Sequence, residues 1–234
     1  MTVNNAEPQG NQEYQFVIAP SRTPDVETRP GSHPRRLDAA TRRATILEAA
    51  VPVFATAGYE QTRVSDIAAR VGVTEPVIFQ NFGTKADLFA SVLDHVSEQA
   101  IAHLSGLAEK HPDVGDWLRQ LLSAGHLDHL HTAPMFGVLF EDAHRLQLEP
   151  GVSAALQRTI ARVAESMASV LQRGQSDGSI RADVAPLSLA WLVASLIQAR
   201  QFRCRFTPET SSQLERDLLD HVLDTFRPAL TKPQ

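Results

Sequence analysis

Polar side chains that can form paired hydrogen bonds lie close together between Thr74 and Asn81. A hydroxyl, a carboxylate and two amides occur there, on Thr74, Glu75, Gln80 and Asn81. On one helix, such groups can bond to base edges in the major groove of DNA, where a carboxylate accepts from cytosine and an amide bridges adenine. Glu75 can instead serve only to favour the N-terminal helix dipole, so its role stays open between these two interpretations.

Basic side chains that can bind phosphates lie on both sides of this segment. Arg35, Arg36, Arg42 and Arg43 form the densest basic cluster of the chain, with only Asp38 opposing them. Cations at the start of a helix oppose its dipole, which a nearby phosphate would explain, whereas the alternative is an ordinary solvated surface. Further phosphate contacts are expected from Thr62, Arg63 and Lys85.

Charge and composition exclude several classes of protein. The 234 residues carry 22 Lys+Arg against 27 Asp+Glu, and the net charge of −5 excludes a polybasic nucleic-acid coat. The single cysteine, Cys204, excludes an internal disulfide framework and a cysteine-based zinc site. No apolar run is long enough for a membrane span and no signal-peptide layout is found, so a cytoplasmic location is expected. Without an acid–base pair, a nucleotide-binding glycine loop or a nucleophile motif, we expect neither an enzyme nor a cofactor.

The apolar pattern predicts an all-α fold that follows a disordered tail. Residues 1–37 are rich in proline and polar residues, and they cannot bury enough apolar surface to become ordered. From about residue 39 onward, apolar side chains recur at helical spacing, and no strand-like alternation is found. The long helices expected after the first 83 residues cover 84–109, 151–174, 186–203 and 210–227.

Residues 62–82 fit two short helices joined by a tight turn. Gly72 ends the first helix, Thr74 caps the second, and Pro76 lies in the first turn of the second, where no N–H is needed. A two-helix unit with a short glycine-containing turn is a helix-turn-helix, whose second helix enters the major groove. The spacing therefore predicts a DNA-reading helix over residues 74–81.

This segment and its flanks resemble the DNA-binding domain of the TetR family of transcriptional regulators. The resemblance covers residues 41–93, and its most specific part is the run IAARVGVTEPVIFQNFGTKADL. Phe79 and Asn81 stand where the family often has tyrosine and histidine, and Phe79 cannot make the phosphate hydrogen bond that a tyrosine can. The matching residues are Ile46, Ala49, Phe54, Gly58, Thr62, Ile67, Ala68, Gly72, Val73, Phe79, Phe82, Lys85 and Leu88.

The resemblance implies two functional domains and a homodimer. Residues 38–83 are expected to form the DNA-binding domain, and residues 84–234 a helical domain for ligand binding and dimerisation through the last two long helices. The usual function is repression from a palindromic operator in double-stranded DNA, relieved by a small-molecule effector. The expected DNA-binding residues are Arg42, Arg43, Thr62, Arg63, Thr74, Glu75, Pro76, Phe79, Gln80, Asn81 and Lys85.

The C-terminal half offers apolar and aromatic side chains for a pocket and for a dimer contact, although each also fits an ordinary core. The candidates for an effector pocket are Trp117, Met135, Phe136, Phe140, His144, Trp191 and Gln198. The candidates for the dimer contact are Leu187, Trp191, Ala194, Leu214, Leu218, Val222 and Phe226.

Two alternatives to an effector-released repressor remain open. His126 and His129 are spaced to share a metal on one helix, and with His131 nearby they suggest a metal-responsive repressor, although a polar helix end before Pro134 explains them equally well. The other alternative is a helical small-molecule binder without operator recognition. The neutral balance of charge over residues 41–90 and the departures at Phe79 and Asn81 favour that interpretation.

Overall fold

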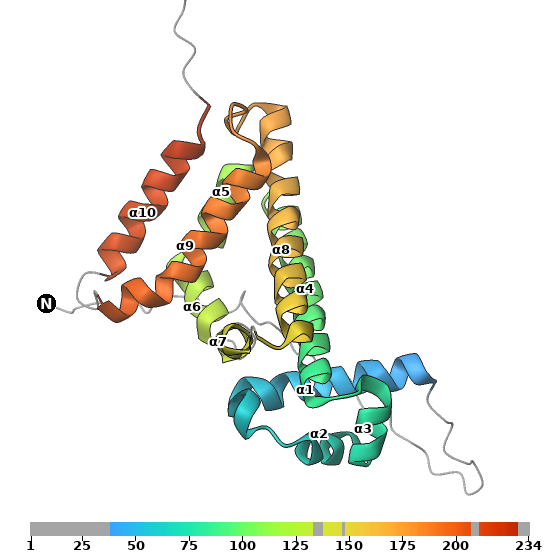
Figure 1. Ribbon diagram of the computed structural model, residues 1–234. Helices are drawn as coiled ribbons and strands as arrows, with labels where there is room; N and C mark the ends of the chain where they lie inside the picture. Colours follow the sequence, from blue (N-terminus) through green and yellow to red (C-terminus); the bar gives the residue numbers. More distant parts are fainter. Residues whose placement is uncertain (1–37, 133–137, 147, 207–210, 229–234) are drawn as a thin grey trace, which may run out of the picture. The chain divides into compact units, whose positions relative to one another are not determined.

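The computed structural model describes residues 38–132, 138–146, 148–206 and 211–228. Within these residues the chain forms helices and no strand, so the predicted all-α fold is confirmed (Figure 1). Residues Ala39–Gln234 make one compact unit. The helices are α1 (Ala39–Gln61), α2 (Val64–Val71), α3 (Glu75–Phe82), α4 (Lys85–Lys110), α5 (Val114–Leu121), α6 (Ala124–Thr132), α7 (Val138–Arg145), α8 (Pro150–Asp177), α9 (Pro186–Phe206) and α10 (Ser211–Phe226).

The glycines of the N-terminal part set the ends and bends of its helices. Gly72 follows α2 in the left-handed region, with φ 71° and ψ 31°, and its N–H bonds to the carbonyls of Ala68 and Ala69. Gly58 interrupts the regular helical backbone near the end of α1. Gly58 has φ 75° and ψ 167°, which bends the chain, and one further helical turn continues α1 to Gln61.

Capping side chains hold α4 but not α2 or α3. Thr84 and Asp87 form a capping box: the Thr84 hydroxyl accepts from the Asp87 N–H, and the Asp87 carboxylate accepts from the Thr84 N–H, both at 3.1 Å. Thr74 occupies the N-cap position of α3 as expected, yet its side chain makes no capping hydrogen bond. The N-cap of α2 is Arg63 rather than a threonine or serine that accepts from the helix.

Two hydrophobic cores lie along α4. The N-terminal core joins α1, α2 and α3 to the first half of α4, and it includes Leu139 and Ala143 of α7 and Val152 of α8. The C-terminal core joins the second half of α4 to α5, α8, α9 and α10 around Trp117, which is fully buried. Because α4 contributes to both cores, it links the first three helices to the rest of the unit.

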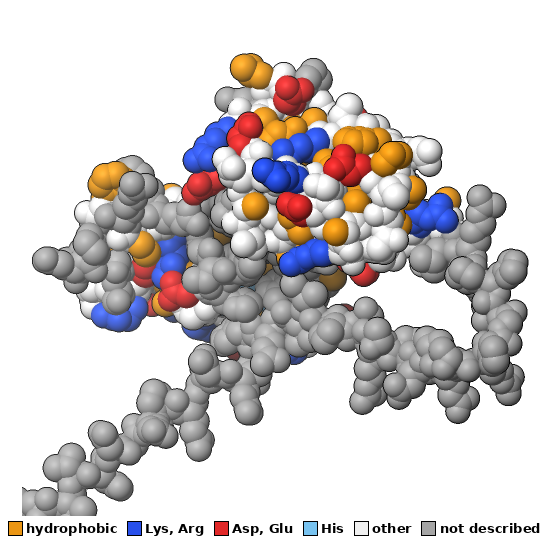
Figure 2. All heavy atoms as spheres, turned by 90° about the horizontal axis from the view of Figure 1, so that it is seen from below, with side chains coloured by type: hydrophobic (Ala, Val, Ile, Leu, Met, Phe, Trp, Pro, Cys, Tyr) orange, Lys and Arg blue, Asp and Glu red, His pale blue; other side chains and the backbone are white. Residues whose placement is uncertain are grey.

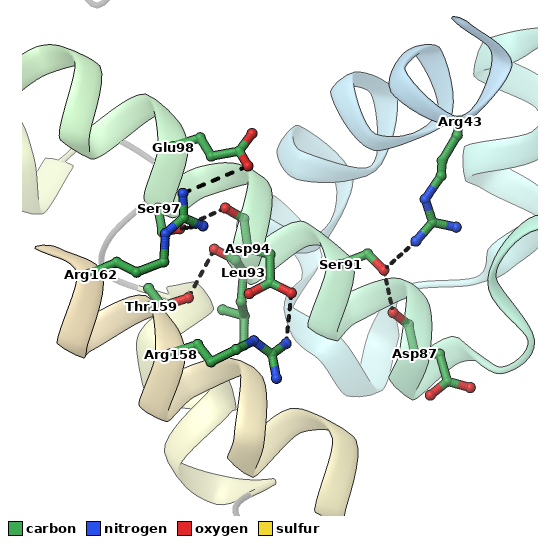
Figure 3. A network of polar contacts seen from close by, with 10 residues as sticks. All are labelled: Arg43, Asp87, Ser91, Leu93, Asp94, Ser97, Glu98, Arg158, Thr159 and Arg162. Carbon is green, nitrogen blue, oxygen red and sulfur yellow. Dashed lines mark hydrogen bonds and ion pairs between the residues drawn. The ribbon is translucent and has the colours of Figure 1, made fainter. Parts of the chain in front are cut away.

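Helix α8 runs beside α4 and is tied to it by polar contacts (Figure 3). Arg158 donates to the Asp94 carboxylate at 2.8 Å, and the buried Thr159 hydroxyl donates to the Leu93 carbonyl at 3.2 Å. The helix expected over 151–174 was three residues too short at its end, since α8 continues to Asp177 and Gly178 follows it in the left-handed region. A Cβ on Gly174 would lie 2.5 Å from Ile180, so this glycine serves close packing rather than termination.

Candidate nucleic-acid interface

Helix α3 has one face in the core and one face in solvent. Ile78 and Phe82 are 1% and 7% exposed and anchor the helix in the N-terminal core. Phe79, next to Ile78 in the sequence, is 40% exposed, an uncommon position for a large aromatic side chain in a folded protein. The other exposed residues of α3 and of its cap include Thr74, Glu75, Pro76 and Gln80.

The turn before α3 is held by the backbone, which fixes how α2 and α3 lie against each other. The Val73 N–H bonds to the Ala68 carbonyl at 3.0 Å, and Ile67 and Ala68 are buried beside Ile78 in the same core. Arg63, at the start of α2, is exposed. An exposed polar helix carried on a rigid two-helix unit is the geometry that places side chains in a major groove.

The surface below α2 and α3 mixes both signs of charge. Figure 2 shows lysine and arginine side chains on this side separated by acidic and apolar ones, without a continuous basic patch. Glu75 of α3 and Asp66 of α2 are among the exposed acidic residues of these helices. Affinity for DNA therefore depends on individual contacts more than on a broad positive field.

Arg43 is exposed, yet its guanidinium is bound by groups of the same domain. Its guanidinium donates to the Asn81 carbonyl at 2.5 Å and to the Ser91 hydroxyl at 3.0 Å. The same group lies 4.1 Å from the centre of the Phe82 ring. Arg43 thus joins α1 to the end of α3 and to α4.

Three other predicted contact residues also have partners inside the domain. The Lys85 ammonium donates to the Glu60 carbonyl at 3.3 Å, and burial lowers the pKa of Lys85. Thr62 is only 3% exposed, and its hydroxyl donates to the Gly58 carbonyl at 2.7 Å. The Asn81 amide donates to a carbonyl one turn back in its own helix, at 2.6 Å.

Apart from Arg42, the predicted DNA-binding residues therefore fall into two groups. One group presents free side chains on the outer face of α3 and at the start of α2. The other group, with Arg43, Thr62, Asn81 and Lys85, makes hydrogen bonds inside the domain. Arg42 is half-buried near the start of α1.

Comparison with known proteins agrees with this geometry. Residues 46–92, from α1 to α4, match the family described as bacterial regulatory proteins, tetR family. The chain belongs to the TetR family. Like the other TetR-family proteins, it is a DNA-binding transcriptional regulator.

Individual TetR-family relatives extend the similarity beyond the matched domain. A transcriptional activator of Mycolicibacterium smegmatis, FasR, is 26% identical over 179 residues, which cover 75% of this chain and 80% of that protein. A transcriptional repressor of Mycobacterium tuberculosis, Rv3405c, is 41% identical over 73 residues, or 30% of this chain and 39% of the repressor. These relatives are regulators and not enzymes.

A solved structure shows the same fold as this TetR-family chain. The crystal structure of a TetR-family regulator from Mesorhizobium loti superposes with a TM-score of 0.66 at 21% identity, covering 81% of this chain and 96% of that one. At this identity the likeness concerns the fold, and it includes the C-terminal helices.

The predicted effector-pocket residues lie in separate places. Trp117 is fully buried in the C-terminal core, and no hydrogen-bond partner of its indole N–H is found in the described residues. Phe140 packs against the N-terminal core, and its carbonyl lies 2.8 Å from Nδ1 of the exposed His144. Trp191 and Gln198 are exposed on α9. Met135 and Phe136 lie outside the described residues.

The predicted dimer residues divide between surface and core. Leu187 and Trp191 of α9 are 44% and 45% exposed, and the neighbouring Leu192 is 41% exposed. Val222 and Phe226 of α10 are buried in the subunit's own C-terminal core. The partly buried candidates are Ala194, Leu214 and Leu218.

The predicted metal-binding histidines begin on α6. His126 is fully buried and stacks on His103 of α4, with ring centres 5.1 Å apart. The side chains of His129 and His131 lie outside the described residues. Among the side chains that are described, no group of three or more His, Cys, Asp or Glu could hold a metal ion. The described helices include none with the length and apolar character of a membrane span.

Proposed function

We propose that this TetR-family chain is a homodimeric repressor that binds a palindromic operator through α3 and leaves it when a small molecule binds. The observation that carries the proposal is the two-sided α3. Ile78 and Phe82 fix the helix in the core, and Glu75, Phe79 and Gln80 are exposed to solvent. Glu75 accepts from a cytosine amino group, Gln80 bridges adenine, and Phe79 contacts a thymine methyl.

The proposed function requires a second copy of the chain, because an inverted-repeat operator is bound by two recognition helices. Two α3 helices must lie about 34–36 Å apart to enter successive major grooves on one face of the duplex. The exposed apolar side chains of α9, Leu187, Trp191 and Leu192, provide a self-complementary surface. We therefore assign the dimer contact to the outer face of α9.

We assign to α4 the link between effector binding and release from DNA. This helix contributes Leu88 and Val92 to the N-terminal core and Leu104 and Leu107 to the C-terminal core. A ligand that binds a state with more widely spaced recognition helices shifts the population away from DNA. A 100-fold preference for that state supplies about 2.7 kcal/mol of coupling.

The sign of regulation needs its own measurement, because FasR is an activator whereas Rv3405c is a repressor. Expression from the promoter of this chain's gene, measured with and without the protein, determines the sign.

The test is a binding selection on randomised duplex DNA with the purified full chain, followed by sequencing. The expected result is an enriched inverted repeat, which then serves as the probe for release by small molecules and by zinc, copper, nickel and cobalt. A folded dimer that enriches no sequence would contradict operator binding and favour a binder without DNA recognition. Release by one of the metals, at unchanged folding, would favour the metal-responsive alternative.

A further inference from the structure

Helix α3 has few side-chain anchors in the rest of the domain. Of its eight residues only Ile78 and Phe82 are buried, and its N-cap Thr74 makes no side-chain hydrogen bond. The last carbonyls of a helix lack partners inside the helix and carry partial negative charge. A cation placed at this end therefore satisfies a carbonyl and opposes the tilt of the helix.

Arg43 supplies that cation from α1. Its two terminal nitrogens donate in different directions, to the Asn81 carbonyl of α3 at 2.5 Å and to the Ser91 hydroxyl of α4 at 3.0 Å. Its flat guanidinium also lies over Phe82, 4.1 Å from the ring centre, within the range of a cation–π contact. A planar fork that meets two acceptors and a ring fixes the relative positions of three helices.

The Ser91 end of this contact belongs to the polar network of α4 (Figure 3). The Ser91 hydroxyl donates in turn to the Asp87 carbonyl at 2.9 Å. Further along α4, Ser97 accepts from Arg162 of α8 at 3.3 Å. Arg43 therefore connects the end of the recognition helix to the helix that runs into the C-terminal core.

We propose that Arg43 is a positioning residue for DNA recognition, which sets the pose of α3 through Asn81, Phe82 and Ser91 instead of neutralising a DNA phosphate. This inference rests on the proposed operator binding through α3. Arg43 then contributes to the sequence specificity of binding, because a helix with a loosened end no longer presents Glu75 and Gln80 to the bases in one register.

The positioning and phosphate-binding roles of Arg43 predict different salt dependences. Each phosphate neutralised by a cation contributes about −0.9 to the slope of log affinity against log salt concentration. A phosphate contact also strengthens operator and non-specific DNA alike, since it reads no sequence. A positioning residue acts on operator affinity and leaves both the slope and the non-specific affinity unchanged.

The experiment measures operator and non-specific binding of Arg43→Ala and Arg63→Ala over a range of salt concentrations. Both substitutions remove one positive charge, and Arg63 is the exposed matched control at the start of α2. For Arg43→Ala we expect about a tenfold loss of operator affinity at an unchanged slope and unchanged non-specific affinity. For Arg63→Ala we expect weaker binding to both DNAs and a slope less steep by about 1.8, since each of the two protomers loses one phosphate contact. A flattened slope in Arg43→Ala would overturn the proposal.

Arg43→Lys keeps the charge and removes the fork, so it tests the proposal even where the alanine variant folds poorly. A single ammonium cannot replace a planar guanidinium on two acceptors and a ring. We expect the lysine variant to lose about as much operator affinity as the alanine variant, with a melting temperature close to that of the wild type. Recovery of wild-type affinity by lysine would overturn the proposal. A wild-type chain that selects no operator would instead refute the proposed function.

Discussion

The carboxylate of Asp142 accepts a hydrogen bond from the backbone N–H of Tyr59 at 2.6 Å. Asp142 lies on α7 and is 6% exposed, whereas Tyr59 follows the Gly58 bend of α1. The bend leaves this N–H outside the regular helical pattern, and the carboxylate satisfies it. Helix α7 is thereby joined to the DNA-binding helices by a route that does not pass through α4.

Asp142→Ala is expected to destabilise the protein. The substitution leaves the Tyr59 N–H without its acceptor in a mostly buried place, which costs about 1–3 kcal/mol of unfolding free energy. Urea denaturation of the wild type and the variant measures this loss. Asp142→Asn keeps an acceptor oxygen and is expected to lose less.

Glu141→Ala is the matched control for that measurement. Glu141 precedes Asp142 on α7, its side chain is 59% exposed, and it lies 3.7 Å from the exposed Arg145. Exposed pairs of this kind contribute little to stability. Its unfolding free energy should stay within about 0.5 kcal/mol of the wild type. An equal loss in both variants would show that the Tyr59 hydrogen bond is not the cause.

The composition of the N-terminal core leads to a second prediction. Leu139 of α7 is fully buried among residues of α1 to α4, although it lies far from them in the sequence. Leu139→Ala is expected to cost about 2–5 kcal/mol and to weaken hydrogen-exchange protection in α1 and α2. The control is Leu121→Ala, because Leu121 is a similarly buried leucine of the C-terminal core. This variant should keep the hydrogen-exchange protection of α1 and α2 closer to that of the wild type. Equal loss in both variants would mean that the two cores unfold as one.

The sequence could predict the helices and the outer face of α3 because both depend on local rules. Helical spacing placed Ile78 and Phe82 on one side and Gln80 on the other. Thr74 and Glu75 are exposed because they begin the helix. Glycine, proline and the Thr84 cap marked most boundaries within a few residues. Gly174 is the exception, because its close contact with Ile180 uses glycine without ending the helix.

The sequence could not predict which polar residues are used inside the domain. Arg43 and Asn81 are 38 positions apart, and the Tyr59–Asp142 contact spans 83 positions. Partners at such separations follow from tertiary packing, and no local spacing marks them. For the same reason, the sequence did not distinguish the role of Arg43 from that of the neighbouring Arg42. Nothing in the sequence indicated the contact made by Asp142.

Base preference and overall affinity should respond to different residues of the interface. Glu75→Ala and Gln80→Ala are expected to change which sequences are selected, with about 1–3 kcal/mol of discrimination lost at one base position. Lys85→Ala is expected to weaken binding to all operators alike. Lys85 begins α4, and its ammonium contacts the Glu60 carbonyl and the Tyr59 ring at the end of α1. Repeating the DNA selection with each variant distinguishes the two effects. Identical selected sequences from all three variants would contradict this division.

The proposed dimer contact on α9 leads to the last prediction. Trp191→Glu places a charge in the middle of an exposed apolar face, where two copies would have to bury it. Sedimentation of the variant is expected to give a monomer with wild-type helix content, and its operator affinity should fall because the two half-sites are no longer bound together. The matched control is Leu148→Glu, since Leu148 is 91% exposed between α7 and α8. It should leave the dimer intact, so a Trp191→Glu protein that still sediments as a dimer would move the contact to another face.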